Sequence, residues 1–110
     1  MSSWFEITKN DNGKFSFALK DDSGETLLVS SKPYFSKGSA MSDISAIRNN
    51  CEYEDFYERQ EANGEHFFNL QAPNHAVLGT SQKFSSAQLL ENAIASAKAQ
   101  GTTRDIKASA

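Results

Sequence analysis

The chain has 110 residues, of which 38% are hydrophobic and 23% are charged, and its formal net charge is −3. This length favours one compact domain, and the composition is typical of a globular protein rather than a disordered one. No window approaches the about 18 apolar residues that a membrane-spanning helix requires. Because nucleic-acid binding depends on clustered Lys and Arg side chains, the acidic balance argues against a nucleic-acid partner.

The cysteine content and the N-terminal sequence bear on the compartment. The single cysteine, Cys51, excludes an intramolecular disulfide bond, which suits a reducing environment. The first residues, MSSWFEITKNDNG, contain no basic segment followed by an apolar run, so they do not resemble a secretory signal. We therefore expect a cytoplasmic protein that does not associate with membranes.

The first half of the chain predicts three strands. Residues 4–8 (WFEIT) are aromatic and β-branched, and the Asn-Gly pair at 12–13 is a strong hairpin signal. In residues 15–20 (FSFALK) large apolar side chains alternate with small or polar ones, which is the period of a strand with one buried face. A turn then leads into a third strand at 26–30 (TLLVS).

A helix follows these three strands. Its evidence is a set of apolar residues at helical spacing, which places them on one stripe: Ala40, Ile44, Ile47 and Cys51. Either Ser36 or Ser39 could serve as the N-cap, since a serine hydroxyl accepts hydrogen bonds from the first free backbone N–H groups of a helix.

The second half repeats this order of elements, displaced by about fifty residues. A short strand begins near Phe56, and a second Asn-Gly turn lies at 63–64. Three alternating residues then take the places of Phe15, Phe17 and Leu19: His66, Phe68 and Leu70. After the strand at 77–81 (VLGTS) comes a second helical stripe: Ala87, Leu90, Ile94 and Ala97. Ser85 with Gln88 fits a capping box, and Gly101 lies where helices tend to end.

The duplication predicts the fold class. Two copies are too few for a solenoid, so we expect them to mate around a pseudo-two-fold axis and cover each other's apolar faces. The prediction is an α+β domain over residues 1–101, made of two tandem β-β-β-α repeats (about 4–52 and 55–101) with an antiparallel sheet and both helices on one side. The tail, 102–110, shows no period, and we expect it to be disordered.

This ordered pattern resembles the YegP-like family, small bacterial proteins of unknown function that carry two tandem copies of a short repeat. The resemblance rests on NGKFSFALK…SGETLLVSSKPYFSKGSAMSDISAIR and NGEHFFNLQ…NHAVLGTSQKFSSAQLLENAIASAK, so it covers nearly all of the chain except about the last ten residues. The family often has Asn-Gly just before the helical Ile, where this chain has Ser42-Asp43 and Asn92-Ala93. The resemblance implies the same fold, and it implies no catalytic residue or cofactor because no activity is established for the family.

The candidate chemical groups are sparse. Cys51, His66 and His75 lack the short spacing of zinc ligands, so we predict no metal site. Cys51 ends a helix beside Glu52, where a thiolate is disfavoured. The acidic segment 51–61 (CEYEDFYERQE) is interpreted as a solvated connector, with an acidic docking site as the alternative.

Phe67 is the aromatic residue that the pattern does not place in the core. If His66, Phe68 and Leu70 face the helices, Phe67 points to the opposite, mostly polar face of the sheet. Either the tail or Trp4 covers it, or it is an anchor for a partner.

These observations leave three functional hypotheses. The first is a non-catalytic binding or interaction module that acts through its sheet surface or an edge strand, with a protein or small-molecule partner. The second is a small-molecule binder or enzyme whose site lies in the groove between the repeats, using His66 with Tyr34 and Phe84 at its rim. The third is a monomer that weakly self-associates through its sheet edges.

Overall fold

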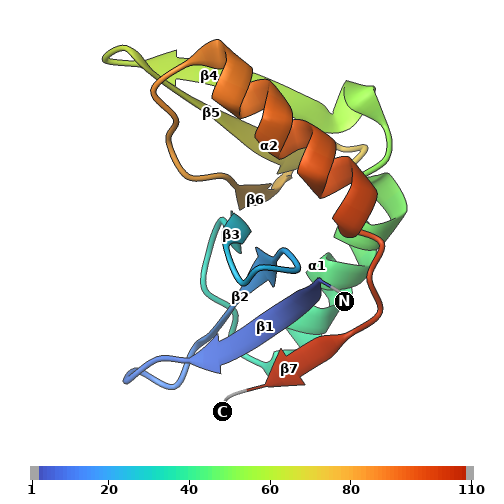
Figure 1. Ribbon diagram of the computed structural model, residues 1–110. Helices are drawn as coiled ribbons and strands as arrows, with labels where there is room; N and C mark the ends of the chain where they lie inside the picture. The colour runs from blue at the N-terminus through green and yellow to red at the C-terminus, as the bar shows by residue number, and fades with distance from the viewer. Residues whose placement is uncertain (1–2, 109–110) are drawn as a thin grey trace.

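The computed structural model describes residues 3–108, which form two β-β-β-α units within one seven-stranded sheet (Figure 1). The first unit contains β1 (Trp4–Lys9), β2 (Phe15–Lys20), β3 (Thr26–Ser30) and α1 (Lys37–Asn50). The short 3₁₀ helix η1 (Glu54–Phe56) leads into the second unit, which contains β4 (Tyr57–Ala62), β5 (Glu65–Gln71), β6 (Val77–Thr80) and α2 (Ala87–Gln100). A last short strand, β7 (Ile106–Ala108), follows α2.

The order of the strands reveals the pseudo-symmetry. The sheet runs β4-β5-β6-β3-β2-β1-β7, so the two units meet at the central pair of β3 and β6. These strands are antiparallel, with Val29 opposite Thr80 and Ser30 opposite Gly79. Apart from β7, each unit therefore repeats the other's arrangement on its own side of this pair. The predicted α+β fold of two mated repeats is confirmed.

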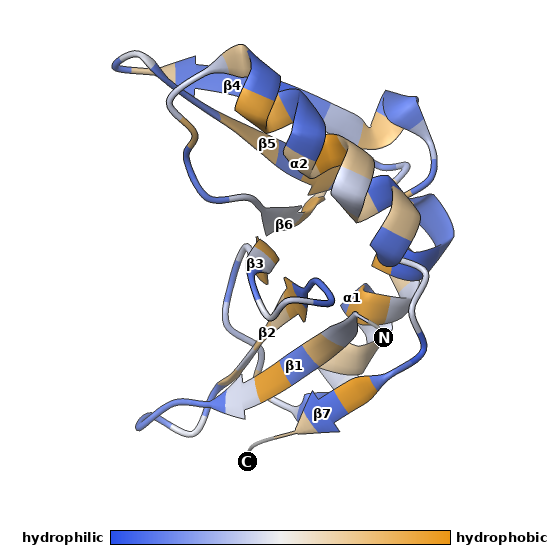
Figure 2. Ribbon diagram, in the orientation of Figure 1, coloured by the Kyte–Doolittle hydropathy of each residue, from blue (hydrophilic) through white to orange (hydrophobic). Residues whose placement is uncertain are grey.

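Both helices lie on one face of the sheet and share a single core with it (Figure 1). The strands contribute these residues to that core, among others: Phe5, Ile7, Phe17, Leu19, Leu28, Phe68, Leu70 and Leu78. Figure 2 shows the alternation of hydrophobic and hydrophilic residues along β1. Helix α1 contacts β6 of the other unit, and α2 likewise contacts β3. Each helix therefore buries apolar surface of both units, which ties the halves together.

Serine side chains fix where the helices begin. Ser36 caps α1 by accepting a hydrogen bond from the backbone N–H of Ser39 at 3.1 Å. Ser86 caps α2 in the same way, accepting from the N–H of Leu89 at 3.2 Å. The sequence pattern favours Ser85 for this second cap, and that prediction is wrong by one residue because adjacent serines give the same local signal.

The segment after α2 also differs from its prediction. Residues 106–108 form β7, which pairs in parallel with β1, placing Ile106 beside Phe5. The N–H of Phe5 donates to the carbonyl of Asp105 at 2.9 Å, and Ile106 packs against the core. The expected disordered tail is therefore ordered in this part, because the open edge of β1 offers unpaired backbone groups that a sequence period cannot reveal. Residues 1–2 and 109–110, assigned above to the domain and the tail, lie outside the described residues.

The acidic connector is likewise part of the fold. It contains η1 and the first residues of β4, and the Tyr57 side chain is buried, with its hydroxyl donating to the carbonyl of Cys51 at 2.6 Å. Glu54 accepts hydrogen bonds from Arg59 of β4 and from Lys98 of α2. These charges hold the linker against the second unit. Neither helix is long and apolar enough to cross a membrane within residues 3–108.

Candidate functional site

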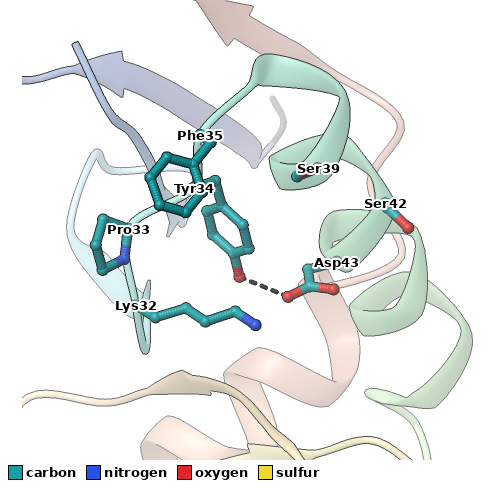
Figure 3. Close-up of a pocket in the computed structure, with 7 residues that line it drawn as sticks. All are labelled: Lys32, Pro33, Tyr34, Phe35, Ser39, Ser42 and Asp43. Atoms are coloured by element: carbon teal, nitrogen blue, oxygen red, sulfur yellow. Dashed lines mark hydrogen bonds between the residues drawn. The ribbon is translucent and has the colours of Figure 1, made fainter.

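A pocket of about 370 Å³ opens at the N-terminal end of α1, between this helix and the loop that follows β3 (Figure 3). Its lining is polar and aromatic: Lys32, Pro33, Tyr34, Phe35, Ser39, Ser42 and Asp43. The loop is held in place because Tyr34 and Phe15 exchange two backbone hydrogen bonds, at 2.8 and 2.7 Å. We call these seven residues the α1 pocket.

Tyr34 forms the floor of the α1 pocket. Its side chain is buried, and its ring stacks on that of Phe17 with a centroid distance of 5.8 Å. The hydroxyl group donates a hydrogen bond of 2.6 Å to Oδ2 of Asp43 (Figure 3). Burial, together with the nearby Asp43 carboxylate, raises the pKa of Tyr34 above its ordinary value. The phenol therefore stays protonated at neutral pH and acts as a donor.

The mouth of the pocket combines an exposed aromatic ring with cations. Phe35 is 83% exposed, although large apolar side chains normally gain free energy when they leave water. Nζ of Lys14 lies 5.1 Å from the centroid of the Phe35 ring, and Nζ of Lys32 lies 5.7 Å from that of Tyr34. Figure 3 shows the Lys32 chain extending beneath Tyr34 toward Asp43. The pocket thus offers an apolar surface, an ammonium group and a carboxylate within one small volume.

The second unit has a hollow at the corresponding place, but its chemistry is different. Alignment of the β-bridges and helix caps matches Phe84 with Tyr34, Leu89 with Ser39, and Ala93 with Asp43. Phe84, Leu89 and Ala93 line a hollow of about 180 Å³ beside α2. The fold therefore forms without the phenol–carboxylate pair, since Phe and Ala occupy those positions in the second copy.

The structure brings together only some of the residues proposed for a groove between the repeats. His66 and Phe84 exchange two backbone hydrogen bonds, of 2.8 and 2.7 Å, and both side chains are half-buried. Tyr34, however, lines the α1 pocket, whereas Phe84 lines the hollow of the second unit. The rings of Tyr34 and Phe84 therefore line different spaces and do not form a common rim in either of them.

Phe67 lies on the outer face of the sheet, opposite Gln60, and is half-buried. Neither of the two covers suggested for it is nearby in the sheet. Trp4 belongs to β1 and the tail to β7, at the other edge from β5, and three intervening strands separate β5 from β1 by roughly 19 Å. The Trp4 ring instead faces Nζ of Lys107 at 4.1 Å. Trp4 and the described part of the tail therefore lie away from Phe67, and its role as an anchor stays a prediction.

Cys51 and the histidines occupy separate environments. The Cys51 thiol is buried, and this burial, together with the charge of Glu52, raises its pKa to about 11. His75 lies exposed in the turn before β6 with a φ of 71°. Among residues 3–108, no cluster of three or more His, Cys, Asp or Glu side chains is arranged to hold a metal ion.

Phe35, Asp43 and Lys32 were not singled out from the sequence. The pairing of Tyr34 with Asp43 depends on how the loop docks against α1, which local patterns do not encode. A partial signal was present, because Ser42-Asp43 and Asn92-Ala93 differ at equivalent positions of two otherwise similar repeats. A comparison of the copies for charged residues in one and apolar residues in the other would have pointed to Asp43.

Comparisons with known proteins agree with this architecture. A sequence profile described as "Domain of unknown function (DUF1508)" matches residues 10–58 and again 61–107. The chain is 44% identical over 108 residues to UPF0339 protein YegP of Escherichia coli (strain K12), with 97% of each covered. It is 40% identical over 108 residues to a UPF0339 protein of Shewanella oneidensis, again with 97% of each covered.

Two solved structures extend the comparison to the fold. The solution NMR structure of YegP from E. coli, a protein of unknown function, matches with a TM-score of 0.92 at 44% identity, covering 99% of this chain and 94% of that chain. The solution NMR structure of a UPF0339 protein from Shewanella oneidensis matches with a TM-score of 0.91 at 38% identity, covering 98% and 92%. With its two tandem DUF1508 copies, this chain therefore belongs to the UPF0339/YegP family.

Proposed function

We propose that the protein is a non-catalytic binding module of the cytoplasm and that its ligand site is the α1 pocket. The observation that carries this proposal is the partly buried hydrogen bond between Tyr34 and Asp43, which the second unit lacks. Phe84 and Ala93 occupy the same places in an equally folded copy. A polar pair that the fold does not require, at the floor of an open pocket, fits a role in recognition.

The protonation states support binding rather than catalysis. A general base must be poised near the working pH, and a nucleophilic thiol must ionise. Tyrosine and cysteine side chains are already protonated at neutral pH, and the raised pKa of Tyr34 and the pKa of about 11 for Cys51 move both groups further from ionisation. Both groups are therefore suited to structural and hydrogen-bonding roles at neutral pH.

The side chains that line the α1 pocket indicate what kind of ligand it would bind. Phe35 offers a flat apolar surface for a ring or an alkyl group. Lys32 suits an anionic or hydrogen-bond-accepting group, and the hydroxyl groups of Ser39 and Ser42 can donate or accept. A small molecule or a single side chain of a protein partner, with one apolar and one polar end, would satisfy these groups together.

Two other hypotheses, a site at His66 and Phe84 and self-association through the sheet edges, have less support. An enzyme or binder that uses His66 and Phe84 is supported by their direct backbone pairing, but Tyr34 lies in a different hollow. Self-association through the sheet edges meets two obstacles, because β4 carries Glu58, Arg59 and Glu61 and β7 has three residues. Charged and short edge strands discourage pairing between molecules.

The proposal is tested by NMR titration of the labelled protein with metabolite mixtures from native cytosol. We expect amide shifts at residues of the α1 pocket, and we expect their loss in the double variant Tyr34→Phe/Asp43→Ala, which copies the second unit. Asn92→Ala in the hollow of the second unit is the matched control and should keep the shifts. Shifts centred on Phe67, shifts centred on His66, or conversion of a metabolite to a product would each refute the proposal.

A further inference from the structure

A second cavity, of about 270 Å³, lies between the C-terminal part of α1 and the segment that follows α2. Its lining comes from both places: Ser45, Arg48, Asn49, Thr102 and Arg104. The described lining therefore holds two guanidinium groups and no carboxylate, in a protein whose net charge is −3. The cavity is separate from the α1 pocket, with which it shares no residue.

The pseudo-symmetry makes this charge pattern unusual. The equivalent of Arg48 in the second copy is Lys98, since both lie in the last turn of their helices. Lys98 donates a hydrogen bond of 2.6 Å to Glu54, which lies in the segment after α1. At the corresponding position after α2 the chain has Arg104 instead of an acid. At the C-terminal end of α2, Lys98 and Glu54 therefore form an ion pair. At the equivalent end of α1, Arg48 and Arg104 are two cations that line a cavity.

Arg48 is held in position before any ligand arrives. Its Nε donates to the carbonyl of Thr103 at 2.8 Å, and its guanidinium carbon lies 5.8 Å from the centroid of the Phe5 ring. Thr103 is itself anchored, because its hydroxyl donates to the carbonyl of Ser3 at 2.8 Å. Among residues 3–108, Arg48 uses only one of its five guanidinium N–H donors in a hydrogen bond, the one to Thr103, so the Nη groups are available to a ligand.

The charged side chains that line this cavity favour the binding of an anion. The C-terminal end of α1 contributes roughly half a negative charge, which the two full positive charges of Arg48 and Arg104 exceed. Guanidinium groups bind carboxylate and phosphate through paired, charge-assisted hydrogen bonds. Asn49, Ser45 and Thr102 add neutral donors around them. We propose that this cavity binds a compact oxyanion, the phosphate or carboxylate group of a small molecule, in the place that Glu54 fills in the other copy.

The size of the cavity limits the ligand. Pockets for drug-sized ligands span about 300–1,000 Å³, so this one, at about 270 Å³, suits a single oxyanion with little attached to it. Inorganic phosphate is the simplest probe, and acetate at the same ionic strength distinguishes a preference for phosphate from one for carboxylate.

The experiment is an NMR titration of the full chain with inorganic phosphate, with sodium chloride added to keep the ionic strength constant. We expect saturable shifts of the Arg48 side-chain Nε–H and of the Asn49, Thr102 and Arg104 amides. Arg104→Glu, which places an acid at the position that corresponds to Glu54, should weaken binding at least about ten-fold. Lys83→Glu makes the same change of charge at an exposed site outside the cavity and should leave the affinity unchanged.

Thermal unfolding gives a second readout that also shows whether each variant folds. Phosphate should raise the Tm of the wild-type chain and of Lys83→Glu, but not that of Arg104→Glu. The proposal is overturned if neither phosphate nor acetate gives saturable shifts. It is also overturned if Arg104→Glu binds as the wild type does, or if Lys83→Glu weakens binding equally, since either result would indicate nonspecific attraction.

Discussion

Cys51 and Gly101 occupy equivalent positions at the ends of the two helices and lie against each other across the pseudo-two-fold axis. A Cβ atom placed on Gly101 would lie 2.7 Å from Sγ of Cys51. The same arrangement recurs in the sheet, where a Cβ on Gly79 would lie 2.7 Å from Cγ of Leu28, its counterpart in β3. At both contacts one copy supplies the side chain and the other supplies the space, which two identical subunits could not do.

We predict that Gly101→Ala destabilises the protein by about 1–3 kcal/mol, the usual cost of overpacking a core. Its φ of −70° suits any residue, so the effect would come from the clash with Cys51 and the carbonyl of Ala97. Gly38→Ala in α1 is the matched control, because only Ser36 Oγ, at 3.9 Å, lies near its added methyl group. Urea unfolding should show a lower midpoint for Gly101→Ala and an unchanged or slightly higher one for Gly38→Ala.

The clash with Cys51 can be tested separately. Cys51→Ala creates room beside residue 101, so the double variant should lose less stability than the sum of the two single changes. Additive losses would mean that the helix ends do not press on each other.

We predict that Tyr34 and Asp43 are coupled. Tyr34→Phe removes the 2.6 Å hydrogen bond to Asp43 and should cost about 1–2 kcal/mol of unfolding free energy. Adding Asp43→Ala reproduces the pair found in the second unit, so the double variant should be more stable than additivity predicts. A double-mutant cycle from urea unfolding measures the coupling. A coupling near zero would contradict this prediction, because it would show that the hydrogen bond contributes nothing to the stability of the fold.

Much of the fold could be predicted from local signals. The alternation in FSFALK matches β2, and both Asn-Gly turns have glycine at positive φ, 80° for Gly13 and 81° for Gly64. The helical stripe ending at Cys51 matches α1 and its buried residues. These features repeat in the second half, and repetition gave each local signal a second, independent confirmation.

The sequence pattern correctly predicts that α2 ends at Gly101, but the reason for glycine at this position differs from the one expected. Helix ends often need glycine for a left-handed backbone, yet this residue is right-handed and is needed for its lack of a side chain. β7 was missed because three residues are too few to show a period, and the strand depends on the free edge of β1. The α1 pocket and the two arginines depend on loop docking, which only the three-dimensional structure reveals.

On the acid side, we predict that Glu54 contributes stability that is lost at low pH. Hydrogen bonds from Arg59 and then Lys98 lower the pKa of Glu54 to about 2. A carboxylate with a lowered pKa in the folded state stabilises that state above its ordinary value near 4.5, and this contribution falls as the pH drops toward 2. Because the side chain is 53% exposed, solvent screens the pair and the effect should stay at or below about 1 kcal/mol.

The measurement is the change of unfolding free energy with pH, between pH 5 and pH 2, for the wild type and for Glu54→Gln. The wild type should lose more stability over this range, and 0.5 M salt should shrink the difference. Glu65→Gln, at an exposed position in β5, is the control and should follow the wild type. Equal slopes for wild type and Glu54→Gln would contradict the prediction.

On the alkaline side, we predict that Cys51 makes the protein less stable as the pH rises above about 9. Burial raises its pKa from 9.0 to about 11 in the folded state, so the folded protein holds the thiol proton more tightly than the unfolded chain. This stabilisation is complete below the unfolded pKa and is lost between about pH 9 and pH 11, by roughly 2–3 kcal/mol in total.

Unfolding is measured between pH 8 and pH 10 for the wild type and Cys51→Ala, and the difference between the two profiles isolates the thiol because both proteins contain the same tyrosines. The wild type should lose stability with pH faster than Cys51→Ala does, whatever the difference between their midpoints at pH 7. A disulfide reagent should react slowly with the folded protein at pH 8 and quickly in urea, because the thiol must first reach solvent. Parallel pH profiles, or fast labelling of the folded chain, would mean that Cys51 lies nearer solvent than the contact with Gly101 allows.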